Sequence, residues 1–438
     1  MASSTPSVRN PWWWVPTSYF SEGIPFALVI WVAGTMFKDL GHSDGQITFA
    51  TSSIGIAWSL KPFWAAFLDM YRTKKFFVLS MEFLMAALLI GIAVSLPLPN
   101  YFQIVIAVLW VMAFASSTQD ICVDGIYITT LDAAKQAAYI GVQGVFWNVG
   151  RIFATAAIVW TAGTLRTDHH MAPETAWGWA MGLGAATLVL LGIYHYFILP
   201  PGSTVERPKN VGAVVTTFAD TWVDFFRKDK IFGMLMFVFL FRCAEGLLLV
   251  EGPLFLQAST EVGGIGLSLK EKGLIDGTIS TFVSLFAGLL GGAFMAKFGL
   301  KRNTLFFMAL CLNLPHVTYI ILSQLAGPGH TLSLWTIGSL VTVEKFGYSF
   351  GFVANMLYMM QQISPGKYQM THYAFANSLM NLMLVPTQMI SGPLADHFGY
   401  KMYFIIVMFA AIPSLLGAWF APFPRKVELP GRPAKAAA

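Results

Sequence analysis

Two stretches, Ser21-Glu22-Gly23-Ile24-Pro25 and Ala244-Glu245-Gly246-Leu247-Leu248, each place a glutamate and a glycine in the middle of a long apolar run. A charged side chain at the centre of a bilayer costs roughly 2.5–3.5 kcal/mol even on lenient insertion scales, so it is rarely present without a role. The two stretches lie about 220 residues apart. This repetition predicts a duplicated membrane fold with a polar site between its halves.

The composition agrees with a membrane environment. Of the 438 residues, 56% are hydrophobic and only 11% are charged, and the mean hydropathy is +0.63. Soluble domains carry about 25% charged residues, which excludes an ordinary globular protein. The three cysteines are separated and lie in apolar segments, which disfavours a disulfide framework and a zinc site. No metal and no cofactor are expected.

Twelve segments are apolar and long enough to cross a bilayer, which requires roughly 20 residues each. They are 14–37, 46–67, 76–97, 102–130, 138–164, 176–199, 231–257, 272–296, 303–325, 332–363, 371–394 and 401–421. The longest polar connection divides them six and six. We therefore predict an all-α polytopic protein of two pseudo-symmetric six-helix bundles, 1–199 and 231–438, with a cytoplasmic linker at 200–230.

The orientation follows from the basic residues of the loops, because Lys and Arg accumulate on the cytoplasmic side. With the N-terminus inside, 18 of them lie on the cytoplasmic side and 5 outside. Both termini are therefore predicted to be cytoplasmic. The basic turn after the second span contains Asp69 and Arg72. It either only controls topology or forms a gating loop that bridges the halves in one conformation.

Ionisable residues within the spans are the strongest functional signal. The acids are Glu22, Glu82, Asp120, Asp124, Glu245, Glu251, Asp276 and Glu344, and the bases are Lys61, Arg151, Arg242 and Lys345. Because acids outnumber bases, some carboxylates lack an ion-pair partner, and an unpaired buried carboxylate is a plausible proton carrier. Glu82 and Asp276 lie near span ends, so they are expected at the membrane interface.

The fourth span carries a polar stripe. Asp120 and Asp124 are four residues apart and so share one helix face, which lipid cannot satisfy. Arg151, in the next span, is the natural ion-pair partner of either aspartate. Such a pair would serve either gating or only helix packing.

The seventh span can form an ion pair within itself, because Arg242 and Glu245 are three residues apart. Pro25 follows Glu22 by three residues, and Pro253 follows Glu251 by two. A proline inside a helix removes a backbone hydrogen bond and permits a break. Irregular backbone is therefore predicted in the first and seventh spans.

Amides, hydroxyls and aromatic rings in the later spans suit a polyhydroxylated ligand with apolar ring faces. The ligand-contact candidates are Asn148, Glu344, Tyr348, Asn377 and Asn381. The alternative for each residue is a hydrogen bond that holds two helices together.

Several motifs resemble the major facilitator superfamily, and within it the branch of AmpG-like muropeptide permeases and acetyl-coenzyme A transporters. They are residues 19–25, 60–64, 116–125, 344–352 and 391–400. The Gln119-Asp120…Asp124 element is the most specific of them. The turn Asp69-Met70-Tyr71-Arg72 departs from the commoner Asp-Arg-x-Gly pattern.

The resemblance implies a proton-coupled transporter, not an enzyme, in a bacterial inner membrane. It would import a glycan-derived oligosaccharide or muropeptide by alternating access. Glu22, Asp124 and Glu245 are the proton-coupling candidates, with Asp120, Arg151 and Arg242 as charge partners. Expected partners are the solute, protons and lipids, without nucleic acid, and a monomer is expected. The alternatives are transport of a siderophore or an acetyl-coenzyme A-type anion, or a sodium-coupled sugar symporter.

Overall fold

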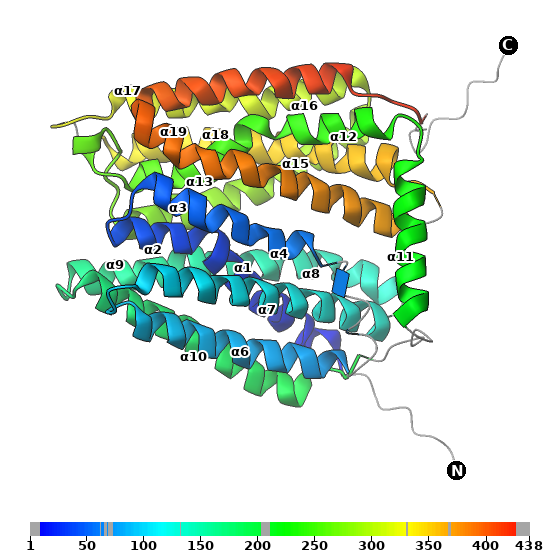
Figure 1. The fold of residues 1–438 in the computed structure, drawn as a ribbon, viewed down its shortest axis with the longest axis horizontal. Coiled ribbons are helices and arrows are strands. Elements are labelled where there is room, and N and C mark those ends of the chain that lie inside the picture. The colour runs from blue at the N-terminus through cyan, green and yellow to red at the C-terminus, as the bar shows by residue number, and fades with distance from the viewer. Residues whose placement is uncertain are drawn as a thin grey trace. The chain divides into compact units, whose positions relative to one another are not determined.

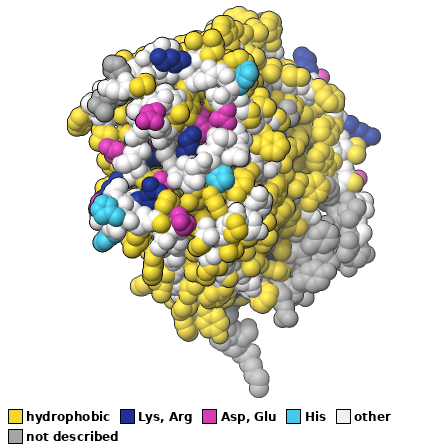
Figure 2. Space-filling model, turned by 60° about the vertical axis from the view of Figure 1, so that its left-hand side comes forward, with side chains coloured by type: hydrophobic (Ala, Val, Ile, Leu, Met, Phe, Trp, Pro, Cys, Tyr) yellow, Lys and Arg dark blue, Asp and Glu magenta, His cyan; other side chains and the backbone are white. Residues whose placement is uncertain are grey.

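The structure is a computed structural model that describes residues 9–61, 63–64, 68, 73–131, 133–202, 211–329, 332–366 and 369–425. The described residues form helices joined by short turns (Figure 1). This confirms the all-α fold class. Hydrophobic side chains cover most of the face seen in Figure 2, as lipid contact requires, and charged side chains gather in one region of it.

In the described part of the chain, nine helical segments are long and apolar enough to span a membrane. They are Pro11–Asp39, Lys74–Ser95, Tyr101–Thr130, Val142–Thr167, Pro173–Ile198, Ile231–Gln257, Leu269–Phe298, Arg302–Leu325 and Thr371–Phe420. The last covers two predicted spans, which are separated by non-helical backbone at Gly399. The predicted spans 46–67 and 332–363 coincide with α3 to α4 (Asp44–Ser59) and with α18 (Leu334–Tyr358) plus η8 (Met359–Ile363). The structure is therefore consistent with twelve spans.

Most of these segments consist of one helix or of two or three consecutive helices, and α11 lies between two of them. In chain order these helices are α1 (Val15–Ala27), η2 (Leu28–Val32), α2 (Ala33–Asp39), α6 (Lys74–Ser95), α7 (Tyr101–Thr130), α8 (Ala133–Ile152), η4 (Phe153–Ile158), α9 (Val159–Thr167), α10 (Pro173–Ile198), α11 (Val211–Phe226), α12 (Ile231–Phe241), α13 (Cys243–Gln257), α14 (Leu269–Lys272), η6 (Gly273–Ile279), α15 (Ser280–Phe298), α16 (Arg302–Asn313), η7 (Leu314–His316), α17 (Val317–Leu325) and α19 (Gln369–Phe420). Helix α11 lies within the stretch expected as a polar connection.

The first and seventh spans are irregular, as predicted. Pro25 lies inside α1, and the π-helical turn η2 follows it directly. In the seventh span Arg242 leaves the helical conformation, at φ −104° and ψ 16°, and so separates α12 from α13. Pro253 lies inside α13. Breaks of this kind are tolerated at membrane depth only where neighbouring protein groups or a cavity satisfy the backbone.

The chain forms two compact units. The N-terminal unit comprises 1–42, 50–214 and 268–277, and the C-terminal unit comprises 43–49, 215–267 and 278–438. In the N-terminal unit α1 packs along α8, and α6 packs between α7 and α10. In the C-terminal unit α13 packs on α19, and α18 packs on α15 and α16.

The glycines that follow the two buried glutamates are sites of close helix packing. A Cβ on Gly23 would lie 2.2 Å from the carbonyl oxygen of Trp147 on α8. A Cβ on Gly246 would lie 2.0 Å from Oγ1 of Thr387 on α19. Only glycine allows this approach. The Glu-Gly pair therefore has the same structural role in each unit. The glycine allows close packing against the neighbouring helix, and the adjacent glutamate is buried.

An ion pair between the loop residue Asp168 and Lys270, the second residue of the segment Leu269–Phe298, gives a pH-dependence of stability that can be measured. Lys270 Nζ lies 2.7 Å from both carboxylate oxygens of Asp168, and this bond, with that from Thr167, lowers the pKa of Asp168. A lowered folded-state pKa contributes stability above the unfolded value of about 3.9, and the contribution is lost as the pH falls through the folded value. Because the pair is exposed, salt weakens it.

We therefore expect Lys270→Met to reduce slightly the acid-induced fall of the melting temperature between about pH 5 and pH 3 at low ionic strength. Lys401→Met, at an exposed lysine of the C-terminal unit, is the matched control. Identical pH profiles for the wild type and Lys270→Met would show that the pair contributes nothing to stability.

Candidate functional site

A cavity of about 350 Å³ lies within the N-terminal unit. Its lining residues are Tyr19, Glu22, Asp120, Asp124, Gln143, Gly144, Trp147 and Asn148. They come from α1, α7 and α8. Four of them, Glu22, Asp120, Asp124 and Asn148, are residues that the sequence singled out. The structure therefore brings the predicted acids of the first and fourth spans to one site, together with two amides and two aromatic rings.

Asp124 is held in place by two neutral donors. Tyr19 Oη donates to Asp124 Oδ1 at 2.7 Å, and Gln143 Nε2 donates to the same oxygen at 3.3 Å. Tyr19 is itself fixed by the edge of the Tyr127 ring, with centroids 6.0 Å apart. Since neutral donors can accompany either protonation state of the carboxyl group, this arrangement does not commit Asp124 to one charge.

The cation paired with Asp120 is Lys61, from the second span. The sequence pattern favours Arg151 for this position, so the structure corrects the partner of Asp120. The Arg151 guanidinium lies 5.4 Å from the centroid of the Trp31 ring, a cation–π contact. Sequence periodicity could not predict that Lys61, just after α4, pairs with Asp120 on α7, because this contact depends on how the two helices pack.

Glu22 is buried, with only 3% of its surface exposed. Its Oε2 has no hydrogen-bond partner among the described residues. Together with Asp120 and Asp124 it gives the cavity three carboxyl groups. An unsatisfied, desolvated carboxylate oxygen is costly, and protonation reduces that cost. The cavity wall therefore has the chemistry to take up a proton or to bind a cationic or hydroxylated group.

The C-terminal unit holds a second polar cluster around Arg242. The predicted pair with Glu245 is confirmed: Arg242 Nε lies 2.7 Å from Glu245 Oε2, and Nη2 bonds the other carboxylate oxygen. Arg242 Nη1 donates to Asn381 Oδ1 at 3.4 Å, and the guanidinium lies 4.7 Å from the Phe352 ring centroid. The pair is bidentate and fully packed, the strong form of an ion pair.

The other predicted ligand contacts of this unit lie on α18 and α19. Tyr348 lies within hydrogen-bonding reach of Arg242. Glu344 is buried, 3.3 Å from Lys345 Nζ and 3.8 Å from His316 Nδ1. Asn377 is half-buried one turn before Asn381. The structure therefore gathers Tyr348 and Asn381 around Arg242. Asp69 and Arg72, the predicted gating loop, lie outside the described residues.

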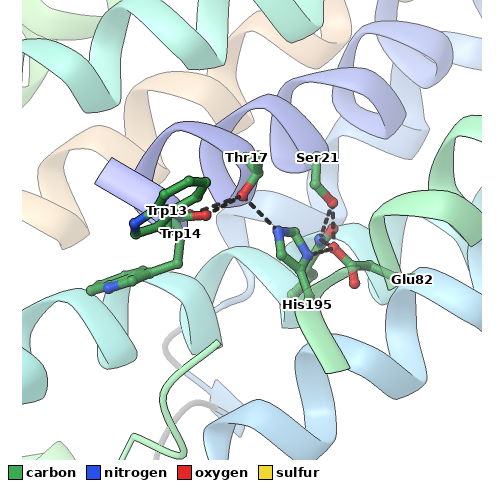
Figure 3. A network of polar contacts seen from close by, with 7 residues as sticks. Trp13, Trp14, Thr17, Ser21, Glu82 and His195 are labelled. Carbon is green, nitrogen blue, oxygen red and sulfur yellow. Dashed lines mark hydrogen bonds and ion pairs between the residues drawn. The ribbon is translucent and has the colours of Figure 1, made fainter. Parts of the chain in front are cut away.

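Glu82 is a correction. It was expected at the membrane interface, but its side chain is completely buried in the N-terminal unit. There it contacts Ser21 and His195 (Figure 3). It also accepts a hydrogen bond from Gln119, and all three partners are fully buried. Sequence reasoning missed these three partners. The available signal was a histidine within the apolar run of the sixth span, with Ser21 and Gln119 directly beside Glu22 and Asp120.

The Tyr19–Asp124 hydrogen bond should be measurable. Tyr19→Phe removes the hydroxyl and leaves Asp124 with one weaker donor, so we expect a loss of about 1.5–3 kcal/mol in the free energy of unfolding. Equilibrium unfolding in mixed micelles checks this. Tyr139→Phe is the control, because the one contact that the Tyr139 hydroxyl makes with the described residues is exposed and 3.5 Å long, to Asn10 Oδ1. Equal stability of the two variants would exclude a strong Tyr19–Asp124 bond.

Known proteins of this architecture match over almost the whole chain. The family model described as Major Facilitator Superfamily matches residues 17–385. The chain belongs to the Major Facilitator Superfamily. It is therefore a multi-pass membrane transporter.

Among the described residues no group of three or more His, Cys, Asp and Glu side chains could hold a metal ion.

Relatives with assigned names come from the AmpG group, as the sequence motifs indicated. A Rickettsia conorii protein named transporter AmpG 4 is 22% identical over 411 residues, which cover 90% of this chain and 92% of the relative. The anhydromuropeptide permease of Escherichia coli is 24% identical over 405 residues, covering 91% of this chain and 77% of the permease.

Solved structures of the superfamily share the fold. A bacterial homologue of the human lysosomal transporter Spinster, in an inward-facing and unoccupied conformation, superimposes with a TM-score of 0.71 at 14% identity. It covers 95% of this chain and 98% of its own. The nucleoside transporter NupG gives a TM-score of 0.70 at 14% identity, over 93% of this chain and 98% of its own. At such identities these structures inform the fold alone.

Proposed function

We propose that this member of the superfamily is a proton-coupled secondary transporter that imports a glycan-derived oligosaccharide or a muropeptide by alternating access. The observation that carries the proposal is the cavity of the N-terminal unit. Three carboxyl groups face it together with Tyr19, Trp147 and the amides of Gln143 and Asn148. Amides and hydroxyls bind sugar hydroxyls, aromatic rings cover sugar ring faces, and the carboxyl groups supply protonatable positions.

The charge of the cavity favours this solute class over an acetyl-coenzyme A-type anion. Asp120 is paired with Lys61, and Glu22 and Asp124 add two further acidic groups. A nucleotide phosphate would meet these carboxylates at close range, which is unfavourable in a low-dielectric site. Relatives of the AmpG group, among them an anhydromuropeptide permease, support the same class. We also propose that the protein lies in a bacterial inner membrane as a monomer. Its two bundles would be 1–199 and 231–438, and both termini would be cytoplasmic.

Glu22 and Asp124 are the proposed coupling residues of the cavity. Asp124 can be tested most directly. Its protonation would weaken the hydrogen bonds from Tyr19 and Gln143, because a bond to a neutral carboxyl group is weaker than one to a carboxylate, and so let α1 and α8 move relative to α7. If Asp124 couples transport to protons, net uptake driven by a pH gradient requires its carboxyl group. Exchange of solute across the membrane at equal pH does not.

The experiment is uptake into liposomes that contain the purified protein, with the pH lower on the side of solute addition. The probes are an anhydro-muropeptide, a disaccharide, a hydroxamate siderophore and acetyl-coenzyme A. We expect pH-driven uptake of one sugar-containing probe, and we expect Asp124→Asn to abolish it while leaving counterflow. Asp168→Asn, at an exposed loop carboxylate, is the control.

The outcomes separate the alternatives. Uptake that requires sodium and ignores pH would replace proton coupling with sodium coupling. Uptake of acetyl-coenzyme A or the siderophore alone would overturn the solute class. Undiminished pH-driven uptake by Asp124→Asn would remove Asp124 from coupling.

A further inference from the structure

A second ionisable site lies in the N-terminal unit and does not line the cavity. Glu82 on α6 and His195 on α10 are both completely buried, and Glu82 Oε1 lies 2.7 Å from His195 Nδ1. Thr17 and Ser21 of α1 and Gln119 of α7 complete the network (Figure 3). Four helices of one unit therefore contribute to a single set of buried hydrogen bonds.

The directions of these hydrogen bonds follow from the donors available. Gln119 Nε2 donates to Ser21 Oγ at 2.7 Å, so the Ser21 hydroxyl donates to Glu82 Oε1 at 2.5 Å. Thr17 Oγ1 lies 3.2 Å from the Trp14 carbonyl and 3.0 Å from His195 Nε2. With the Thr17 hydroxyl directed at the carbonyl, its oxygen accepts a bond from a protonated Nε2. In the other tautomer Thr17 donates to Nε2, and Glu82 is left as a fully buried carboxylate facing a neutral imidazole, which is unfavourable. We therefore infer that Nε2 is protonated.

One proton must then lie between Glu82 and His195. Nδ1 and Oε1 are 2.7 Å apart, and without a hydrogen two lone pairs would face each other at that distance. The proton can belong to His195, as an ion pair, or to Glu82, as a neutral pair. Both forms contain the same number of protons and satisfy the same heavy-atom geometry.

Among the described residues of the packed helices, no other charge neutralises the pair. The other titratable groups of these elements are Tyr19 and Glu22 on α1, Tyr101, Asp120, Cys122, Asp124 and Tyr127 on α7, Lys74 and Lys75 on α6, and Glu174, Tyr194 and Tyr196 on α10. Glu174 lies in the first turn of α10 and His195 in its last. Tyr19 bonds Asp124, Lys61 pairs with Asp120, and Tyr194 donates to the Trp13 carbonyl. Within the described part of the chain, Glu82 Oε2 has no hydrogen-bond partner. Loss of the shared proton would therefore leave a buried, uncompensated negative charge.

The pair is joined to the cavity through neighbours in sequence. Ser21 bonds Glu82, and the next residue, Glu22, lines the cavity. Gln119 bonds Glu82, and the next residue, Asp120, lines the cavity. A movement of α1 that changes the position of Glu22 also displaces Ser21 and Thr17, which hold the two ends of the pair.

We propose that Glu82 and His195 form a second proton-binding site of the N-terminal unit, buried behind the cavity and separate from the carboxyl groups that line it. One proton is shared between Glu82 Oε1 and His195 Nδ1. Helix α1 influences the proton affinity of the pair, because its residues Ser21 and Thr17 hydrogen-bond Glu82 and His195. The ligand of the site is a proton alone. The proposal does not depend on which solute is carried.

The first test is the pH dependence of stability. In an unfolded chain Glu and His titrate near about 4.3 and about 6.5, so above about pH 7.5 the unfolded pair binds no proton while the folded pair binds one. Stability then falls as the pH rises. The equilibrium constant for unfolding should increase by about tenfold per pH unit more in the wild type than in Glu82→Gln, whose amide replaces the protonated carboxyl group. Equilibrium unfolding of the full chain in detergent–SDS mixtures between pH 7 and pH 9 measures this.

The matched control is Glu174→Gln, which removes a half-buried carboxyl group at the start of α10 and should keep the wild-type slope. Parallel profiles for the wild type and Glu82→Gln would overturn the proposal. A failed solute panel in liposomes bears only on the proposed function, because unfolding requires no solute.

A second measurement guards against a Glu82→Gln variant that does not fold. It uses nitrogen-15 histidine spectra of the wild-type protein in micelles between pH 6 and pH 8. One histidine signal with hydrogen bonds at both ring nitrogens should stay unchanged over that range and vanish in His195→Gln. A pH-dependent change of that signal over the range would show that the pair does not retain its proton.

Discussion

Glu245→Gln is expected to lower the free energy of unfolding by about 3–5 kcal/mol, the range for removing one partner of a buried ion pair. Arg242 makes two bonds to Glu245, and its remaining contacts are to an amide and aromatic groups. The variant would leave a buried guanidinium without its counter-charge. Equilibrium unfolding in mixed micelles measures the loss.

Two further variants make this prediction specific. In the double variant Arg242→Gln/Glu245→Gln both charges are removed, so much of the loss should be recovered and the double-mutant cycle should give a strong coupling energy. Glu261→Gln, an exposed carboxylate of the same unit, should leave stability within about 0.5 kcal/mol of the wild type. Additive effects of the Arg242 and Glu245 changes would contradict the pairing.

The same variants test the transport role proposed for Glu245. If its protonation drives the conformational cycle, Glu245→Gln should abolish pH-driven uptake in liposomes and leave counterflow intact. Since counterflow needs a folded carrier, it also reports whether the variant is still assembled. Full active uptake by Glu245→Gln would exclude Glu245 as the coupling acid.

The second large effect is expected at the crossing of α1 and α8. In Gly150→Leu the Cβ would lie 2.2 Å from the Phe20 carbonyl oxygen, and a Cβ on Gly23 would lie as close to the Trp147 carbonyl. Backbone stands on both sides, so the helices must separate. Overpacking of this kind costs about 1–3 kcal/mol and occasionally more. Moving α1 also displaces Tyr19 and Glu22 from the cavity, so uptake should be lost in both Gly23→Leu and Gly150→Leu.

Gly144→Ala is the matched control for stability, because it changes a glycine of the same helix whose Cβ would meet open space. Since alanine favours helices over glycine by about 1 kcal/mol, this variant should be neutral or more stable. Gly23→Ala and Gly150→Ala should be destabilised despite that gain. Wild-type stability in either would show that α1 and α8 do not pack as closely as described.

Much of the architecture could be predicted because the bilayer imposes strong, local rules. Span length, the absence of charge and the excess of basic loop residues are properties of the sequence alone. The prolines Pro25 and Pro253 also identified the two spans with irregular backbone, and the three-residue spacing of Arg242 and Glu245 sufficed to predict their pair. An intrahelical contact needs only the helical period.

Contacts between helices could not be predicted in this way. Two examples are the ion pair of Lys61 with Asp120 and the burial of Glu82 against His195. Both depend on which helices are neighbours and on how deep each residue lies in the bundle. The position of Glu82 near a span end suggested that it lies at the membrane interface, but α10 and α7 pack along α6 and Ser21 of α1 bonds Glu82, so its side chain is buried. Similarly, the role of Gly23 and Gly150 becomes evident only when the opposing carbonyl groups are located.

The sequence by itself determined that this is a duplicated helical membrane protein with ionisable groups at bilayer depth, because the solvent dictates helix length and charge placement residue by residue. Its family followed from the resemblance of its motifs. Only the tertiary structure decided which of those groups share a cavity and which form a closed pair behind it. The physical reason is that pairing in the interior is set by distances of a few ångströms between helices distant in sequence, and no local rule fixes those distances.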